Sequence, residues 1–60
     1  MNESLWNIDQ VAAYLGVAVA TIYTWRTKKY GPVGRRVGKH VRWDPQVVKD
    51  WFAAQPAEVA

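Results

Sequence analysis

The chain has 60 residues, enough for one small domain and too few for a second hydrophobic core. Cysteine is absent and His40 is the only histidine, which excludes disulfides, thiolate chemistry and an ordinary zinc site. The formal net charge is +3, yet all but one of the eight Lys and Arg residues lie between positions 26 and 42, a window without an acid. Half of the residues are hydrophobic and four are Trp, so we expect aromatic packing to stabilise the fold.

The uncharged run from Val11 to Trp25 is too short for a membrane-spanning helix. A span needs about 20 apolar residues, whereas this run has 15 and is interrupted by a glycine, two tyrosines and two threonines. The opening MNES carries an acid and no base, unlike the basic start of a secretory signal. We therefore expect a cytoplasmic protein.

The segment NIDQVAAYLG, residues 7–16, has the pattern of an amphipathic helix. Its apolar positions follow the spacing i, i+3, i+4 and i+7, which places on one helical face Ile8, Val11, Ala12 and Leu15. Asn7 is a good N-cap with Gln10 as its capping-box partner, and Gly16 is a typical stop. The sequence predicts a helix between these ends.

The segment AVATIYTWRTKK, residues 18–29, contains no Pro or Gly and predicts a second helix that ends at Tyr30-Gly31-Pro32. Ala18 stands where a Ser or Thr cap is expected. On a helical wheel Ala18, Ile22 and Trp25 share one face. The roughly opposite face carries Ala20, Tyr23, Thr24 and Thr27. Two short helices joined around a glycine are typical of a helix-turn-helix. The predicted core of this region is Leu15, Val17, Ile22 and Trp25.

The segment RRVGKHVRW, residues 35–43, predicts two short strands around Gly38-Lys39. Strand alternation directs Val41 and Trp43 to one side and His40 and Arg42 to the other. An isolated hairpin is marginally stable, so this one must pack on the helices.

Asp44-Pro45 predicts the start of a third helix, with a cap followed by proline at the first position. Its core face is expected to hold Val48, Trp51 and Phe52, and Gln55-Pro56 closes it. The tryptophans expected in the core are Trp25, Trp43 and Trp51, while Trp6 and Tyr30 are candidates for contact with a neighbouring protomer.

The order helix, turn, helix, hairpin, helix predicts a mainly α fold with a small β-hairpin, a winged helix-turn-helix. We expect residues 1–60 to form a single domain, with an ordered core at 5–54 and a frayed tail at 55–60. The basic window indicates one face that binds a polyanion. A solvated basic loop is the alternative interpretation.

Four motifs in this order resemble those of the small winged helix-turn-helix proteins of the phage excisionase and AlpA-like group, distant relatives of the MerR DNA-binding domain. They are A-x-x-L-G-V at residues 12–17, T-I-Y-x-W at 21–25, V-G-K-x-V-R-W at 37–43, and a closing helix that ends in W-F. The similarity covers about residues 5–53.

The resemblance implies that the second helix enters the major groove of double-stranded DNA and that the hairpin, as a wing, reaches the flanking backbone or minor groove. It also implies a bacterial protein associated with the nucleoid. Excisionases of this group bend attachment-site DNA and bias a tyrosine integrase toward excision; relatives regulate transcription. No cofactor is implied.

A recognition helix usually reads bases with its N-terminal residues. Here these are Val19, Ala20, Thr21 and Thr24, none of which forks onto guanine as Arg does, so we predict weak direct readout. The candidate DNA-contacting residues are Ala20, Thr21, Tyr23 and Thr24 of the second helix, Arg26, Lys28 and Lys29 near its end, and Arg35, Arg36, Lys39, His40 and Arg42 of the hairpin. The cations suit phosphates, although helix-end lysines also complement the helix dipole.

The leading interpretation is an architectural DNA-binding protein, an excisionase that self-associates on DNA. The alternatives are a small transcription regulator of the same fold and an adaptor whose basic wing binds an acidic protein. No paired carboxylates, activated nucleophile or phosphate-cradling glycine loop indicates an enzyme.

Overall fold

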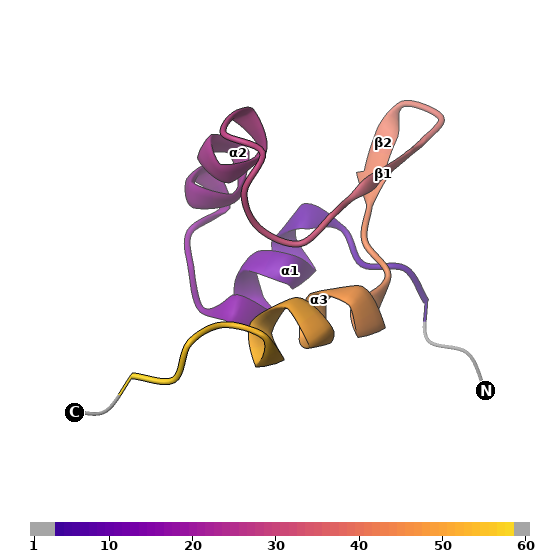
Figure 1. The fold of residues 1–60 in the computed structure, drawn as a ribbon. Helices are drawn as coiled ribbons and strands as arrows, with labels where there is room; N and C mark the ends of the chain where they lie inside the picture. Colours follow the sequence, from indigo (N-terminus) through magenta and orange to yellow (C-terminus); the bar gives the residue numbers. More distant parts are fainter. Residues whose placement is uncertain (1–3, 59–60) are drawn as a thin grey trace.

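The computed structural model describes residues 4–58 and contains three helices and one antiparallel hairpin. In chain order these are α1 (Ile8–Leu15), α2 (Val19–Thr27), β1 (Arg35–Val37), β2 (His40–Arg42) and α3 (Pro45–Ala53). Helix α1 lies between α2 and α3, and the hairpin projects to the same side of the molecule as α2 (Figure 1). The mainly helical winged helix-turn-helix predicted from the sequence is confirmed.

The ends of α1 are the ones that its sequence predicts. The Asn7 side chain accepts a hydrogen bond from the Gln10 amide, and the Gln10 side chain accepts one from the Asn7 amide, which completes a capping box. Gly16 ends the helix with φ of 71°, in the left-handed region that glycine adopts without a steric penalty. Asp44 caps α3 with its side chain, which accepts a hydrogen bond from the Gln46 amide, and Pro45 follows at the first helical position.

The end of α2 differs from the expectation, because the helix stops at Thr27 and does not continue to Tyr30. The Tyr30 amide donates to the Trp25 carbonyl at 2.8 Å and the Lys29 amide to the Arg26 carbonyl at 3.2 Å, the paired bonds of a Schellman motif. The rings of Tyr30 and Trp25 supply the apolar contact of this motif, with centroids 5.2 Å apart. Lys29 adopts φ of 57°, where glycine is usual.

The hairpin pairs Arg36 with Val41 and Val37 with His40, leaving Gly38 and Lys39 as a two-residue turn. Gly38 has φ of 63°, whereas Lys39 is not among the residues with positive φ. A positive φ at only the first turn position is the pattern of a type II′ turn, which fits the twist of the two strands. The turn predicted at this site is confirmed.

The buried core draws one or two side chains from each helix, together with Trp43, which follows β2. Its members are Val11, Ala12, Ile22, Trp43 and Val48. Leu15, Val17 and Trp25, which the sequence placed in the core, are half-buried and pack against this cluster from outside.

Trp43 joins the hairpin to the rest of the domain. Its indole is 1% exposed and donates from Nε1 to the Pro32 carbonyl at 3.2 Å. Its backbone exchanges two hydrogen bonds with Trp6, at 2.8 and 2.9 Å, in an isolated antiparallel bridge. A Cβ on Gly34 would lie 2.8 Å from the indole and 2.9 Å from Val41 Cγ1, so only glycine fits this approach. The bridge to Trp6 was not predicted.

Apart from Trp43 and Tyr23, the aromatic side chains form two groups outside the buried cluster. Trp51 is half-buried, with its ring centroid 5.5 Å from that of Trp25 and 5.6 Å from that of Tyr30. Phe52 is 58% exposed and lies edge-on to Tyr14, so the prediction that it packs in the core with Val48 is wrong. Its position on α3 directs it past the core toward α1.

Trp6 packs within its own chain: it is half-buried, and its ring centroid lies 5.3 Å from that of Tyr14. Tyr30 keeps 50% of its surface exposed.

Residues 56–58 of the predicted tail adopt no helix or strand, and residues 59–60 lie outside the described part of the chain, as do residues 1–3. Between residues 4 and 58, no helix is long and apolar enough to cross a bilayer.

Replacing Lys29 with glycine is expected to stabilise the protein. The left-handed conformation costs a non-glycine residue about 1–2 kcal/mol. Because glycine loses more backbone entropy on folding, the expected net gain is about 0.5–1 kcal/mol. Lys28→Gly is the matched control: Lys28 has φ of −89°, so glycine brings it no relief and should destabilise. Urea unfolding measures both changes, and a loss of stability in K29G would contradict the expectation.

Replacing Gly34 with alanine is expected to destabilise the protein by about 1–3 kcal/mol, the usual cost of overpacking. The added methyl group meets the buried Trp43 indole and Val41 Cγ1 below 3.0 Å, and the indole has no free space into which to withdraw. The same substitution in a Val41→Ala background should cost less, since one of the two obstructing side chains is then shortened. Equal melting temperatures for wild type and G34A would refute this packing.

Candidate functional site

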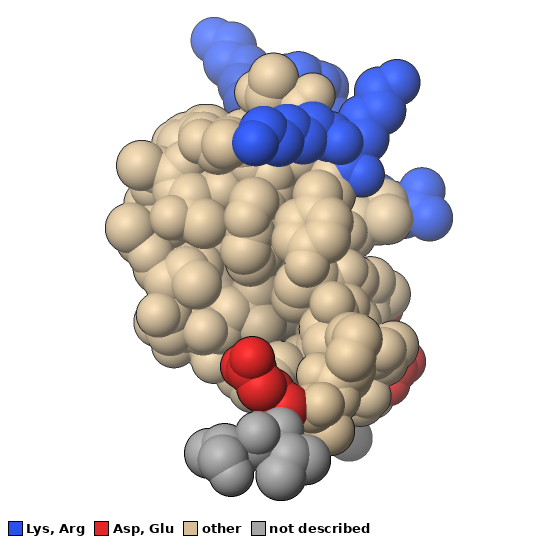
Figure 2. Space-filling view, turned by 60° about the vertical axis from the view of Figure 1, so that its left-hand side comes forward, with Lys and Arg blue, Asp and Glu red and all other residues tan. Residues whose placement is uncertain are grey.

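Charge is separated along the molecule. Lys and Arg side chains gather at the end formed by α2 and the hairpin, and Asp and Glu side chains appear at the opposite end (Figure 2). The sequence predicted the separation along the chain, with all the cations but Lys49 in one window. The fold turns that window into one face of the molecule, because α2 and the hairpin project in the same direction.

The cations of this face are open to solvent. Exposed members are Arg26, Lys28, Lys29, Arg35, Arg36 and Lys39, and only Arg42 is half-buried. In the described part of the chain none of them pairs with a carboxylate. We define this group of seven side chains as the basic face. A basic face without neutralising acids is suited to a polyanion, because its charges repel one another until an anion is bound.

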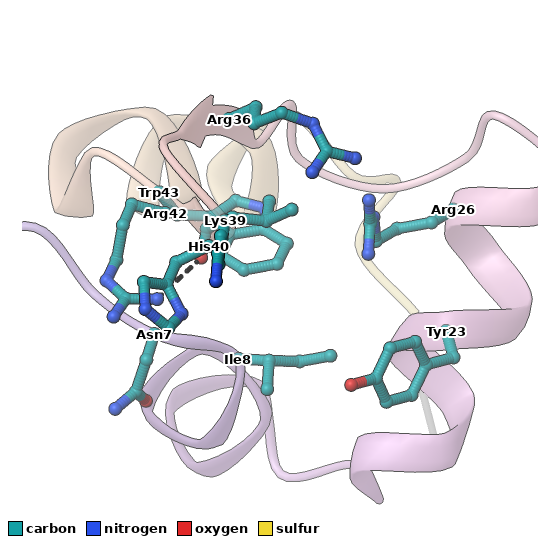
Figure 3. Close-up of a pocket in the computed structure, with 10 residues that line it drawn as sticks. Asn7, Ile8, Tyr23, Arg26, Arg36, Lys39, His40, Arg42 and Trp43 are labelled. Carbon is teal, nitrogen blue, oxygen red and sulfur yellow. Dashed lines mark hydrogen bonds between the residues drawn. The ribbon is translucent and has the colours of Figure 1, made fainter.

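A cleft of about 340 Å³ separates α2 from the hairpin (Figure 3). Tyr23 and Arg26 line it from α2. The hairpin lines it with Arg36, Lys39, His40, Val41 and Arg42. The lining is completed by Asn7 and Ile8 at the start of α1 and by Trp43. The arrangement places five cationic or imidazole side chains around one concave surface, with an aromatic ring and an aliphatic side chain beside them.

The two sides of β1 face different surroundings. Arg36 lines the cleft together with its strand partner Val41, whereas its neighbours Arg35 and Val37 line a second groove on the outer side of the wing. This follows from strand geometry, in which successive side chains point to opposite faces. Adjacent arginines of the same strand therefore serve different surfaces.

The outer groove is mainly apolar. Its exposed hydrophobic side chains are Leu5, Val33, Val37 and Val47, and it is also lined by Arg35, Arg42 and Asp44.

Arg42 lines both the cleft and this groove, and its Nη1 donates to the Val41 carbonyl at 3.0 Å. His40 lines the cleft although strand alternation alone directs it away from Val41; its position at the start of β2, next to the turn, brings it to the rim.

The solvent side of α2 carries the predicted base-reading residues. Ala20, Tyr23 and Thr24 are exposed, and Thr21 is half-buried. Thr24 Oγ1 donates to the Ala20 carbonyl at 3.1 Å. Because this bond uses the only hydroxyl proton, the free lone pairs of Thr24 are hydrogen-bond acceptors toward a ligand.

Val19 does not belong to the reading surface. It is half-buried and packs against the core, so its inclusion among the base-reading residues of α2 is corrected. The physical reason is helical geometry: Val19 precedes the buried Ile22 by three residues and therefore shares its face.

Lys29, whose backbone is left-handed, lines a separate hollow with Arg26 along residues 29–34.

The cleft residues that the sequence did not indicate are Asn7, Ile8, Val41 and Trp43. Asn7 and Ile8 were assigned only to the cap and the apolar face of α1, and Trp43 only to the core. No pattern in the sequence predicts that the start of α1 lines the same cleft as the hairpin.

Among residues 4–58, no group of three or more His, Cys, Asp or Glu side chains could hold a metal ion.

Comparison with known proteins supports the architecture. A family model described as a helix-turn-helix domain matches residues 7–56, which include all three helices and the hairpin. A search of the curated proteins found no match to this chain.

Proposed function

The chain belongs to the helix-turn-helix domain family, and we propose that it is an architectural protein that binds attachment-site DNA as an excisionase. Membership of this family indicates binding to double-stranded DNA. The observation that carries the proposal is the basic face, which occupies the same side of the molecule as α2 and the wing (Figure 2). In the proposed complex α2 lies in the major groove and the wing contacts the backbone or minor groove.

The side chains on α2 favour an architectural role. Its exposed N-terminal half offers alanine, threonine and tyrosine, and none of these forms the bidentate contact that arginine makes with guanine. The cations, by contrast, are numerous and suited to phosphates, which position a protein without reading sequence. Specificity would then come largely from the ease with which a site is deformed. This balance, with the resemblance to phage excisionases, supports bending of attachment-site DNA and an effect on a tyrosine integrase.

Several copies are proposed to bind side by side. One small domain offers a single α2 to the major groove, so useful affinity requires contacts between neighbours or a second site. The separation of positive and negative ends supports an arrangement in which the acidic end of one copy faces the basic face of the next (Figure 2).

A gel-shift titration on genomic fragments of the source organism tests DNA binding, with the shifted fragments identified by sequencing. Neutralising about five phosphates predicts that log K falls against log salt concentration with a slope near −4 to −5. We expect a ladder of shifted species on one locus that contains closely spaced repeats. No shift of any fragment at about 150 mM salt would refute the proposal, because specific binding should persist under these conditions.

The biological role is tested by a recombination assay with the integrase encoded nearest to the selected locus. Excision that increases with this protein supports the excisionase role. A footprint over a promoter without any change in recombination products would instead favour a transcription regulator, with the same DNA-binding surface.

Thr24→Val is expected to remove the preference for one base. The substitution preserves the shape of the side chain and deletes the hydroxyl, whose lone pairs accept from the amino group of adenine or cytosine. A lost neutral hydrogen bond of about 0.5–1.5 kcal/mol corresponds to roughly a three- to tenfold loss on the preferred base. Selection from a randomised duplex pool measures the change. Thr24→Ser keeps the hydroxyl and should keep the preference; an unchanged consensus for T24V would show that Thr24 reads no base.

A further inference from the structure

Two arginines from different elements converge on the cleft. The guanidinium groups of Arg26, from α2, and Arg36, from β1, point toward one another from opposite sides (Figure 3). Neither pairs with a carboxylate within residues 4–58. Two like charges facing each other across a concave surface raise the energy of the free protein, and an anion placed between them reverses the sign of that interaction.

We propose that Arg26 and Arg36 clamp a single phosphate of the DNA backbone between α2 and the wing, an inference that rests on the proposed DNA binding. Guanidinium groups suit this role because each presents a planar fork of N–H donors that matches two phosphate oxygens. A phosphodiester has two unesterified oxygens and can therefore be held from both sides at once.

The other side chains of the cleft fit the surroundings of such a phosphate. The Tyr23 hydroxyl points into the cleft and offers a further donor, and Lys39 stands at its rim (Figure 3). The Ile8 side chain and the Tyr23 ring supply an apolar surface for the adjoining sugar. The cleft thus combines charge for one phosphate with a non-polar wall, and Lys28, Lys29 and Arg35 lie outside it.

The clamp has a geometric consequence. In this arrangement one phosphate contacts both α2 and β1. The DNA strand that carries this phosphate, between the major groove and the neighbouring groove, therefore takes one fixed position relative to both elements. Phosphate contacts of this kind set the register of a protein on DNA. Arg26 and Arg36 are thus positioning residues for the base contacts of α2.

DNA fragments with a single neutral methylphosphonate, placed in turn at each backbone position of the selected site, test the clamp. Neutralising the clamped phosphate should weaken wild-type binding about tenfold or more, since two charge-assisted bonds are lost. Arg26→Gln and Arg36→Gln should each weaken binding to unmodified DNA and flatten the salt slope by about one unit. Because the remaining arginine still contacts the clamped phosphate, each variant should be less sensitive than wild type to the methylphosphonate, at the same single position.

Arg35→Gln is the matched control, because Arg35 neighbours Arg36 on β1 and carries the same charge, but lines the outer groove. It should retain the full sensitivity at the clamped position. The R26Q/R36Q double variant should lose less affinity than the product of the single losses, since both arginines act on one phosphate, whereas the losses of R26Q and R35Q should multiply. Circular dichroism melting confirms that each variant is folded.

Reduced sensitivity of R26Q and R36Q at two different positions would overturn the clamp while leaving DNA binding intact. So would multiplicative losses in the double variant. If the cleft binds only free phosphate, no methylphosphonate position will exist at which wild type loses affinity and R26Q and R36Q lose less. That result also overturns the proposal. Failure of the wild-type protein to shift unmodified DNA is a separate result, which removes the proposed function itself.

Discussion

Burial of the Trp43 indole is the constraint on which the arrangement of the other elements depends. The hairpin has only three residues in each strand and is too small to be stable alone. It is held because the chain directly after β2 enters the core, where the indole meets Val48, Val11 and Ile22 in one cluster. The Pro32 carbonyl and the bridge to Trp6 satisfy its polar groups, so the burial leaves no orphaned donor.

The same constraint positions the candidate binding surface, because Trp43 also lines the cleft. The wing cannot move relative to the core without displacing Trp43, and α2 is fixed to the core through Ile22. The two walls of the cleft, α2 and the hairpin, are therefore both anchored in the same buried core. Such rigidity reduces the entropy lost on binding, since the charged groups are already held near their working positions.

Much of the fold could be predicted from local chemistry. The capping residues Asn7 and Asp44, the glycine of the hairpin turn and the helical spacing of apolar residues act over a few positions and are visible in the sequence. The basic face was predictable for the same reason, as a charge window. Contacts between distant segments could not be predicted in this way. The bridge from Trp6 to Trp43, for example, joins positions 37 apart in sequence. The stop of α2 was missed because lysine occupies a backbone position where glycine is the usual signal.

The alternation of side chains along β1 makes the chemistry of the cleft depend on loop length. Residues 28–34 connect α2 to β1, and the place of Gly34 is fixed by its approach to Trp43. Inserting one residue between Gly34 and Arg35 would keep composition and net charge almost unchanged, yet the strand would pair one step out of register. Arg35 would then turn toward the cleft and Arg36 toward the outer groove, together with every other side chain of the strand. The number of residues between Gly34 and the strand therefore decides which of the two arginines lines the cleft.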